Sequence, residues 1–166
     1  MKVLIVGFER WGSYSTNPSQ YVAEKLDGKK IAGAKIKGVV LPVNFKTLPK
    51  TLHHAIKKYR PDILITLGLA FRNMDKITLE TVAKRKIKPF FPDNYGRWPN
   101  GTNKPRLYDV IGKEKGPFFR KSKLPLKNII SKLKKANIPL SVSQKQEGTC
   151  ASRFFILGNI LWKKKN

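Results

Sequence analysis

The sequence predicts an α/β protein of three layers, in which helices flank a mostly parallel, twisted sheet. Three observations lead to this prediction. Apolar, β-branched runs such as KVLIVGF at residues 2–8 are typical of strands that are buried on both faces of a parallel sheet. These runs alternate with segments of helical spacing, and such alternation implies βαβ units. A long irregular, basic segment at about residues 88–125 then interrupts the alternation.

The first half of the chain is expected to contain three strands and two helices. Asn17 is an expected N-cap with Pro18 at the first helical position, and Gly28 is expected to stop this helix. A second helix is expected at residues 45–59, because its apolar residues share one face and Pro61 follows. The three strands are expected at residues 2–8, 36–43 and 63–69.

The second half of the chain shows weaker signals. The apolar segment at residues 152–162, SRFFILGNILW, is expected to be helical despite Gly158. The other elements expected here are a strand at residues 77–83, a helix at 127–136 and a short strand at 140–143.

Residues 88–125 combine prolines, glycines and aromatic residues without periodicity. A segment of this length inside a compact domain is usually functional or ordered by a partner. No internal repeat or low-complexity linker divides the chain, so we expect a single domain over residues 1–166, with a basic end at residues 163–166.

The composition excludes several classes of protein. Hydrophobic residues make up 40% of the 166 residues, which is too many for a disordered basic tail. One Cys excludes an internal disulfide framework and favours a reducing compartment. No apolar run reaches the roughly 18 residues of a membrane span, and the N-terminal residues do not resemble a signal peptide. The composition therefore predicts a cytoplasmic protein without a membrane partner.

The charge is the most unusual property of the sequence. The chain has 35 Lys and Arg against 10 Asp and Glu, a formal net charge of +25. Basic residues interleaved with aromatic residues offer phosphate contacts and stacking surfaces, and this pattern favours nucleic acid as the partner. The residues expected to contact it are Lys84, Arg85, Lys86, Lys88, Arg97, Arg120, Lys121, Lys123, Lys127, Lys132, Lys134, Lys135, Lys163, Lys164 and Lys165.

Several short motifs occur in an order that resembles one known family. They are GFERWG after the first strand, Asn17-Pro18, Leu41-Pro42-Val43, Pro61-Asp62-Ile63 followed by Gly68-Leu69-Ala70, Ile77-Thr78-Leu79-Glu80, and Pro92-Asp93-Asn94. Together they resemble the pyroglutamyl peptidase I (pyrrolidone carboxyl peptidase) family, whose members are cysteine peptidases that remove N-terminal pyroglutamate. The resemblance extends from residue 1 to about residue 160 and implies the fold of that family.

The resemblance also implies site residues. Cys150 matches the nucleophile, Glu80 matches the acid that orients the catalytic His, and Phe8 with Trp11 match aromatic positions beside the pyroglutamyl ring. Arg10 replaces the Pro of the family's first-loop motif, GFEPFGG. The family's catalytic His, which follows the nucleophile helix, has no match, because the two histidines of the chain are His53 and His54 on the second predicted helix, where a solvated position is expected.

These observations lead to one expected function and two alternatives. The expected function is a C-terminally truncated, catalytically inactive homologue that binds structured RNA, such as rRNA in a ribosomal subunit, beside neighbouring ribosomal proteins. The Lys- and Ile-rich composition suggests an archaeal translation apparatus. The first alternative is an active pyroglutamyl peptidase with a base from another subunit or an unusual residue. The second is an architectural DNA-binding protein. No cofactor or metal is expected.

Overall fold

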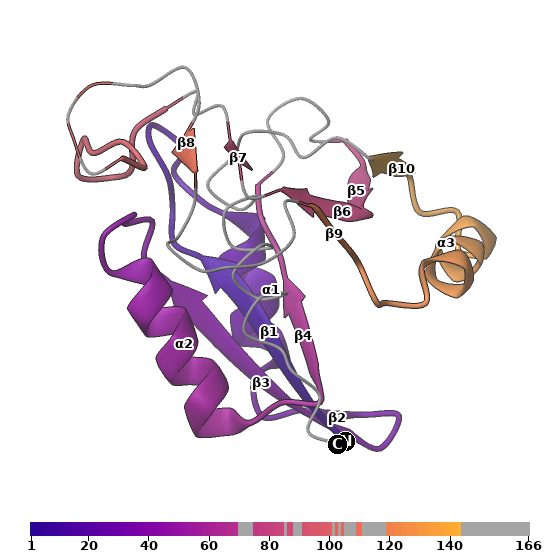
Figure 1. Ribbon diagram of the computed structural model, residues 1–166. Coiled ribbons are helices and arrows are strands. Elements are labelled where there is room, and N and C mark those ends of the chain that lie inside the picture. Colours follow the sequence, from indigo (N-terminus) through magenta and orange to yellow (C-terminus); the bar gives the residue numbers. More distant parts are fainter. Residues whose placement is uncertain are drawn as a thin grey trace.

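Figure 1 shows the computed structural model of the chain, with a four-stranded sheet at its centre. The strands lie in the order β2-β3-β1-β4, and β1 is parallel to both of its neighbours. Their bounds are Lys2–Phe8 for β1, Lys30–Ile31 for β2, Ala34–Leu41 for β3 and Ile63–Thr66 for β4. The structure describes residues 1–69, 75–84, 86–87, 91–100, 102, 104, 109–110 and 119–143.

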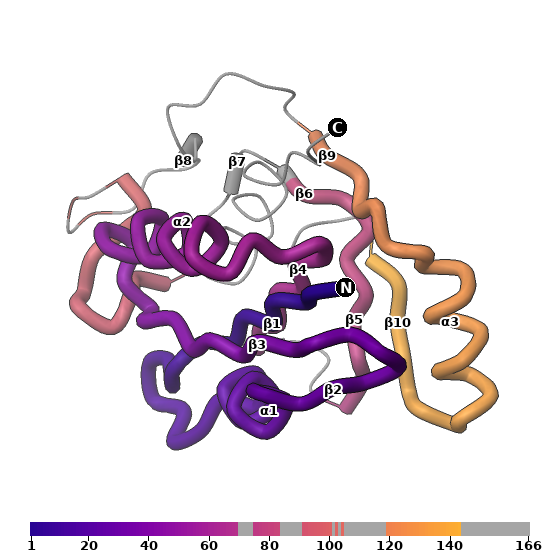
Figure 2. Tube along the Cα trace, turned by 90° about the horizontal axis from the view of Figure 1, so that it is seen from below, coloured from indigo at the N-terminus to yellow at the C-terminus, as the bar shows by residue number. Residues whose placement is uncertain are grey.

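Two helices cover opposite faces of this sheet, so the predicted three-layer α/β fold is confirmed (Figure 2). Helix α1 (Pro18–Leu26) packs on one face and α2 (Leu48–Tyr59) on the other. Side chains of β1 alternate between the two faces, as the pleat of a strand requires. Val3 and Ile5 pack in the core on the α1 side, while Leu4, Val6 and Phe8 pack in the core that includes Leu48 and Leu52 of α2.

Helix α1 approaches the sheet closely because two strands carry glycine at the contact. A methyl group added at Gly7 of β1 would overlap the Ser19 carbonyl, and one added at Gly38 of β3 would overlap the Ala23 carbonyl. The predicted start of this helix is confirmed: Asn17 Oδ1 accepts the Ser19 N–H at 3.1 Å.

Helix α2 begins at Leu48, three residues later than the 45–59 range predicts. The residues before it form a turn: Asn44 Oδ1 accepts the N–H groups of Lys46 (2.9 Å) and Thr47 (3.1 Å), and the Asn44 carbonyl accepts the Leu48 N–H (3.1 Å). Such bonds are those of a capping residue. Residues 44–47 thus form a capped turn that leads from the end of the sheet into α2.

The single strand expected at residues 77–83 is instead two strands, β5 (Ile77–Glu80) and β6 (Val82–Lys84). Thr81 separates them because it bonds on two sides. Its N–H donates to the Ser143 carbonyl and its own carbonyl accepts the Ser122 N–H, at 3.0 and 2.8 Å. The chain therefore changes partner here from β10 (Leu140–Ser143) to β9 (Phe119–Lys121).

The remaining elements lie beside the central sheet. Strand β5 is parallel to β10, β6 is antiparallel to β9, and β7 (Lys86–Ile87) is antiparallel to β8 (Asp109–Val110). The segment predicted as irregular thus contains β8 and β9. Helix α3 (Leu126–Lys135) stands apart from α1 and α2 and has no buried residue (Figures 1 and 2).

Some predictions cannot be compared with the structure. The helix expected at residues 152–162 lies outside the described residues. Within the described part, no helix has the length and apolar character needed to cross a membrane.

Candidate active site

The connections of the sheet change side at β1. The connection through α1 leads from β1 to β3, and the connection through α2 leads from β3 to β4 on the other side of β1. In open α/β sheets, ligands bind beyond the carboxyl ends of the strands at such a switch point. The topology therefore favours a site at the end of β1, where residues 9–14 follow Phe8.

Three segments far apart in sequence are joined at this end of the sheet. We call them the site segments: the loop at residues 9–14, the loop at residues 42–47 and the turn at residues 91–98. Glu9 joins all three, because its Oε1 accepts the Val43 N–H at 2.9 Å and the Asn94 Nδ2 at 3.1 Å. This carboxylate therefore has a positioning role in the fold of the site.

Asn94 completes the connection between the first loop and the turn. Its Nδ2 donates to the Arg10 carbonyl at 2.7 Å, and its Oδ1 accepts the Gly12 N–H at 3.1 Å. Its backbone N–H donates to the Val43 carbonyl at 3.1 Å. Asn94 thus holds the loop at residues 9–14 and the loop at residues 42–47 against the turn.

Asp93 is the buried acidic residue of the site segments, with 4% of its surface exposed. Its Oδ2 accepts the Phe45 N–H, and its Oδ1 accepts the N–H groups of Tyr95 and Arg97, each at 2.9 Å. The tight turn also needs Gly96, whose φ of +70° favours glycine. A buried carboxylate with three backbone donors is well compensated, so Asp93 stabilises the turn against the loop at residues 42–47.

The two predicted pocket residues, Phe8 and Trp11, lie together in the core on the α2 side. Both are buried, and the Trp11 Nε1 donates to the Pro92 carbonyl at 3.0 Å. The Trp11 and Phe91 rings pack edge to face, with an interplanar angle of 84° and ring centroids 5.7 Å apart. The indole therefore connects the first loop to the turn, and its contact with a substrate stays a prediction.

Glu80 is the last residue of β5 and is half-buried. It lies opposite Ser143, the last residue of β10, in parallel register. Cys150 follows β10 in the sequence and lies outside the described residues. The predicted acid, Glu80, thus lies on β5. The neighbouring strand, β10, precedes the predicted nucleophile, Cys150, in the sequence.

The predicted nucleic-acid residues are spread over several elements. Arg97 is exposed on the turn of the site segments, and Arg120 is half-buried in β9. Lys84 belongs to β6 and Lys86 to β7, and the structure describes the backbone of both but not their side chains. Five further predicted residues lie outside the described residues: Arg85, Lys88, Lys163, Lys164 and Lys165. The exposed remainder, on and between β9 and α3, is Lys121, Lys123, Lys127, Lys132, Lys134 and Lys135.

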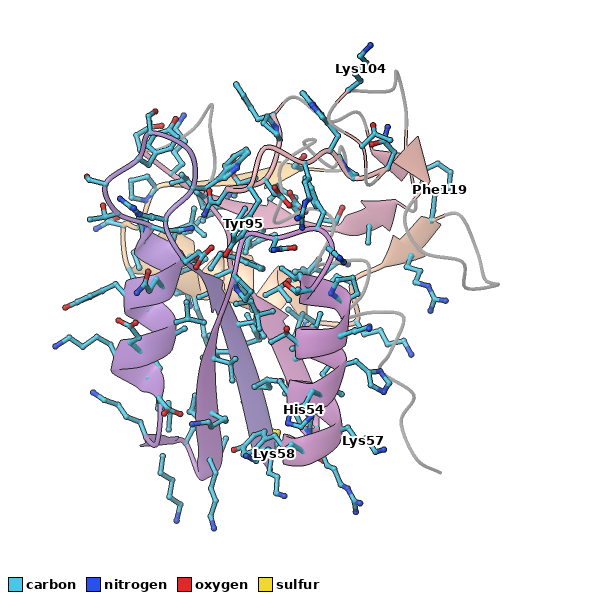
Figure 3. The ribbon with its side chains drawn as sticks, turned by 90° about the vertical axis from the view of Figure 1, so that its left-hand side faces the viewer. His54, Lys57, Lys58, Tyr95, Lys104 and Phe119 are labelled. Carbon is cyan, nitrogen blue, oxygen red and sulfur yellow. The ribbon has the colours of Figure 1, made fainter. Side chains whose placement is uncertain are left out.

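The two histidines lie on α2 and are exposed, as expected. Figure 3 shows His54 beside Lys57 and Lys58 in the lower part of the molecule, well below Tyr95 of the turn. His54 therefore lies away from the site segments.

Glu9, Asp93 and Asn94 were not predicted as site residues from the sequence. A signal for them was present, since Glu9 lies in the GFERWG motif and the other two in Pro92-Asp93-Asn94. Their role depends on contacts between residues far apart in the chain, which motif positions alone do not show. Among the described residues, no group of three or more His, Cys, Asp or Glu could hold a metal ion.

Comparison with known proteins identifies the family of the chain. The model of the pyroglutamyl peptidase family matches residues 1–165. The pyrrolidone-carboxylate peptidase of Pyrococcus furiosus is 36% identical over 143 residues, which are 86% of this chain and 64% of the relative. The enzyme of that name from Vibrio campbellii is 39% identical over 142 residues, 86% of this chain and 63% of the relative.

Solved structures agree with this comparison. The crystal structure of pyrrolidone carboxyl peptidase from the hyperthermophile P. furiosus matches with a TM-score of 0.84 and 34% identity, covering 95% of this chain and 71% of that one. The chain thus spans a little under two thirds of the length of the curated relatives from P. furiosus and V. campbellii.

The expected function is wrong in the light of these relatives. A catalytically inactive, RNA-binding ribosomal protein was expected from the charge and the missing His. Instead, relatives 36% and 39% identical over most of the chain carry the name of a peptidase, and the family model is that of a peptidase. A net charge describes the surface of a protein and does not specify its chemistry. A nucleic-acid partner stays a prediction.

Proposed function

Because the chain belongs to the pyroglutamyl peptidase family, we propose that it is a cysteine peptidase that removes pyroglutamate from the N-terminus of peptides. The Cys150 thiolate attacks the carbonyl carbon of the pyroglutamyl residue and forms a carbon–sulfur bond. The amide carbon–nitrogen bond then breaks as the leaving amine takes up a proton. Water hydrolyses the thioester and releases pyroglutamate, which regenerates the thiol.

The observation that supports this proposal best is the assembly of the family's motifs at one end of the sheet. The motifs GFERWG, Leu41-Pro42-Val43 and Pro92-Asp93-Asn94 contribute to the three site segments, which side-chain hydrogen bonds hold together. Hydrogen bonds from fixed side chains to neighbouring loops preorganise a binding site. Glu80 adds a carboxylate at the end of the strand beside β10.

The nucleophile needs help to ionise. A free Cys has a pKa of about 8.5, so only a few per cent is thiolate at neutral pH. His53 and His54 are exposed on α2 and do not serve as the base in our proposal. The rate should therefore rise with pH toward about 8.5, and free imidazole in the buffer should raise it further. By resemblance Glu80 orients an imidazole, so this acceleration should depend on Glu80.

A fluorogenic amide of pyroglutamate tests the proposal, with the corresponding amide of proline as the control for the ring carbonyl. We expect fluorophore release from the pyroglutamyl amide alone, and its loss in Cys150→Ser. Replacement of both histidines by Gln should leave the rate unchanged, whereas Glu80→Gln should abolish the acceleration by imidazole. No release at any pH, or release that persists in Cys150→Ser, would refute the proposal.

The same proposal bears on the compartment. A catalytic thiol must stay reduced, and disulfides persist in oxidising compartments. The single Cys of the chain is consistent with this requirement, so we propose a cytoplasmic location.

A further inference from the structure

Each of the three site segments carries an exposed cation. Arg10 lies in the loop at residues 9–14, Lys46 in the loop at residues 42–47 and Arg97 in the turn at residues 91–98. We call these three residues the cationic rim. Side-chain hydrogen bonds hold the backbones of these residues near one another. Asn94 Nδ2 donates to the Arg10 carbonyl, and the Asp93 carboxylate accepts the N–H of Arg97 and of Phe45, the neighbour of Lys46.

Within the described site segments, Glu9 and Asp93 form no ion pair with this rim. Glu9 and Asp93 turn their carboxylates to N–H donors of the loops, as described above. The ion pairs found within the described part of the chain join Lys37 to Asp27 and Lys76 to Asp75, so none involves the rim. The Arg97 guanidinium lies 6.0 Å from the centroid of the Tyr95 ring, a cation–π contact that brings no negative charge to the rim.

Arg10 lies where the first loop departs from the family's motif. It replaces the Pro of the first-loop motif and stands next to Trp11, one of the two predicted pocket residues. A substrate whose pyroglutamyl ring occupies that pocket must lead its following residues past this loop. An extended peptide advances about 3.3 Å per residue, so the first two or three residues after the ring lie within reach of long cationic side chains.

We propose that the cationic rim selects peptides with acidic residues directly after the N-terminal pyroglutamate. This inference rests on the proposed function and names its substrate class. Pyroglutamate carries no ammonium group, so an acidic peptide with this end is attracted to the rim over its whole length. A peptide with a free N-terminus brings a positive charge to the same place and is repelled. Like-charge juxtaposition is a common means of excluding wrong partners.

The test is a binding experiment with four peptides on the Cys150→Ser protein, in which no turnover interferes. The peptides begin with pyroglutamyl or acetyl-alanyl, continue with Glu-Glu or Gln-Gln, and carry the same dye at the C-terminus for fluorescence anisotropy. The comparison of pyroglutamyl with acetyl-alanyl peptides tests the proposed function. The comparison of Glu-Glu with Gln-Gln peptides tests the rim. We expect the pyroglutamyl-Glu-Glu peptide to bind about tenfold more tightly than its Gln-Gln counterpart at low salt, with the difference falling at about 0.5 M salt.

Charge-removing variants locate the effect. Arg10→Gln, Lys46→Gln and Arg97→Gln should each reduce the preference for Glu-Glu by about two- to fivefold, the range of an exposed charge pair. Lys57→Gln and Lys58→Gln remove the same charge from the far end of α2 (Figure 3) and should leave the preference unchanged. Equal affinity for Glu-Glu and Gln-Gln peptides would overturn the inference, as would equal losses in the rim and control variants. Equal affinity for the two N-terminal groups would instead refute the proposed function.

Discussion

Replacing Asp93 by Asn should weaken the protein, because this buried carboxylate accepts three backbone N–H groups. Asn offers one oxygen where Asp93 offers two, so at least one backbone N–H would face an NH₂ group. If the amide oxygen keeps the bonds to Tyr95 and Arg97, the buried Phe45 N–H loses its bond to the carboxylate.

The magnitude follows from these contacts. An unpaired buried N–H costs about 1–3 kcal/mol. The two remaining bonds lose the charge on their acceptor, which roughly halves their strength, or about 0.5 kcal/mol each. Asp93→Asn should therefore lower the free energy of unfolding by about 2–4 kcal/mol. A domain with typical stability of about 5–15 kcal/mol would still fold.

Urea denaturation at pH 7, followed by circular dichroism, measures this loss. The matched control is Asp75→Asn, because the Asp75 side chain is 72% exposed and its ion pair with Lys76 is 3.9 Å long. The control should change stability by less than about 0.5 kcal/mol. An Asp93→Asn protein with the midpoint and slope of the wild type would show that the buried carboxylate does not hold the site segments together.

Three further predictions concern neighbouring parts of the fold. Gly38→Ala should destabilise the protein by about 1–3 kcal/mol or more in the same denaturation assay, because the added methyl overlaps the Ala23 carbonyl of α1. The control Lys35→Ala, at an exposed position of the same strand, should be nearly neutral. The hydrogen bond from Lys37 and then that from the Gly38 N–H lower the pKa of Asp27 below its ordinary 3.8. The stabilisation by Asp27 is therefore present above pH 3.8 and lost as the pH falls through the lower folded-state pKa. At pH 7, Asp27→Asn should lower the free energy of unfolding by less than about 1 kcal/mol, since the pair of Asp27 with Lys37 is partly exposed. Near pH 2 it should lower it by nothing, and an equal loss at both pH values would contradict this. Trp11→Phe removes the 3.0 Å bond to the Pro92 carbonyl and should cost about 1 kcal/mol and raise the KM for a pyroglutamyl amide, while an unchanged KM would separate the indole from the site.

Much of the central sheet could be predicted because its signals are local. The strand at Lys2–Phe8 is a β-branched run, and the start of α1 depends on Asn17 and Pro18, which are adjacent in the sequence. The two boundaries that were wrong have different causes. The turn at Asn44, which precedes α2, is formed by neighbouring residues, whereas the β5–β6 break at Thr81 depends on Ser143, a residue 62 positions away.

The site could be predicted only in part for the same reason. Family motifs led to Glu80, Phe8 and Trp11, but the contacts that join the site segments connect residues that lie 34 to 85 positions apart. The function was predicted wrongly because the surface charge was given more weight than the motifs. Charge of this kind governs attraction at a distance, whereas the chemistry depends on a few residues at the site.

The central claim is that Cys150 forms a covalent intermediate with the pyroglutamyl group. Acid quenching of the protein during turnover of a pyroglutamyl ester, followed by mass spectrometry of its peptides, tests this most directly. We predict a pyroglutamyl thioester on the peptide that contains Cys150 and none in the Cys150→Ser protein. An unmodified Cys150 in a sample that releases pyroglutamate, or no release and no adduct at all, would contradict the account.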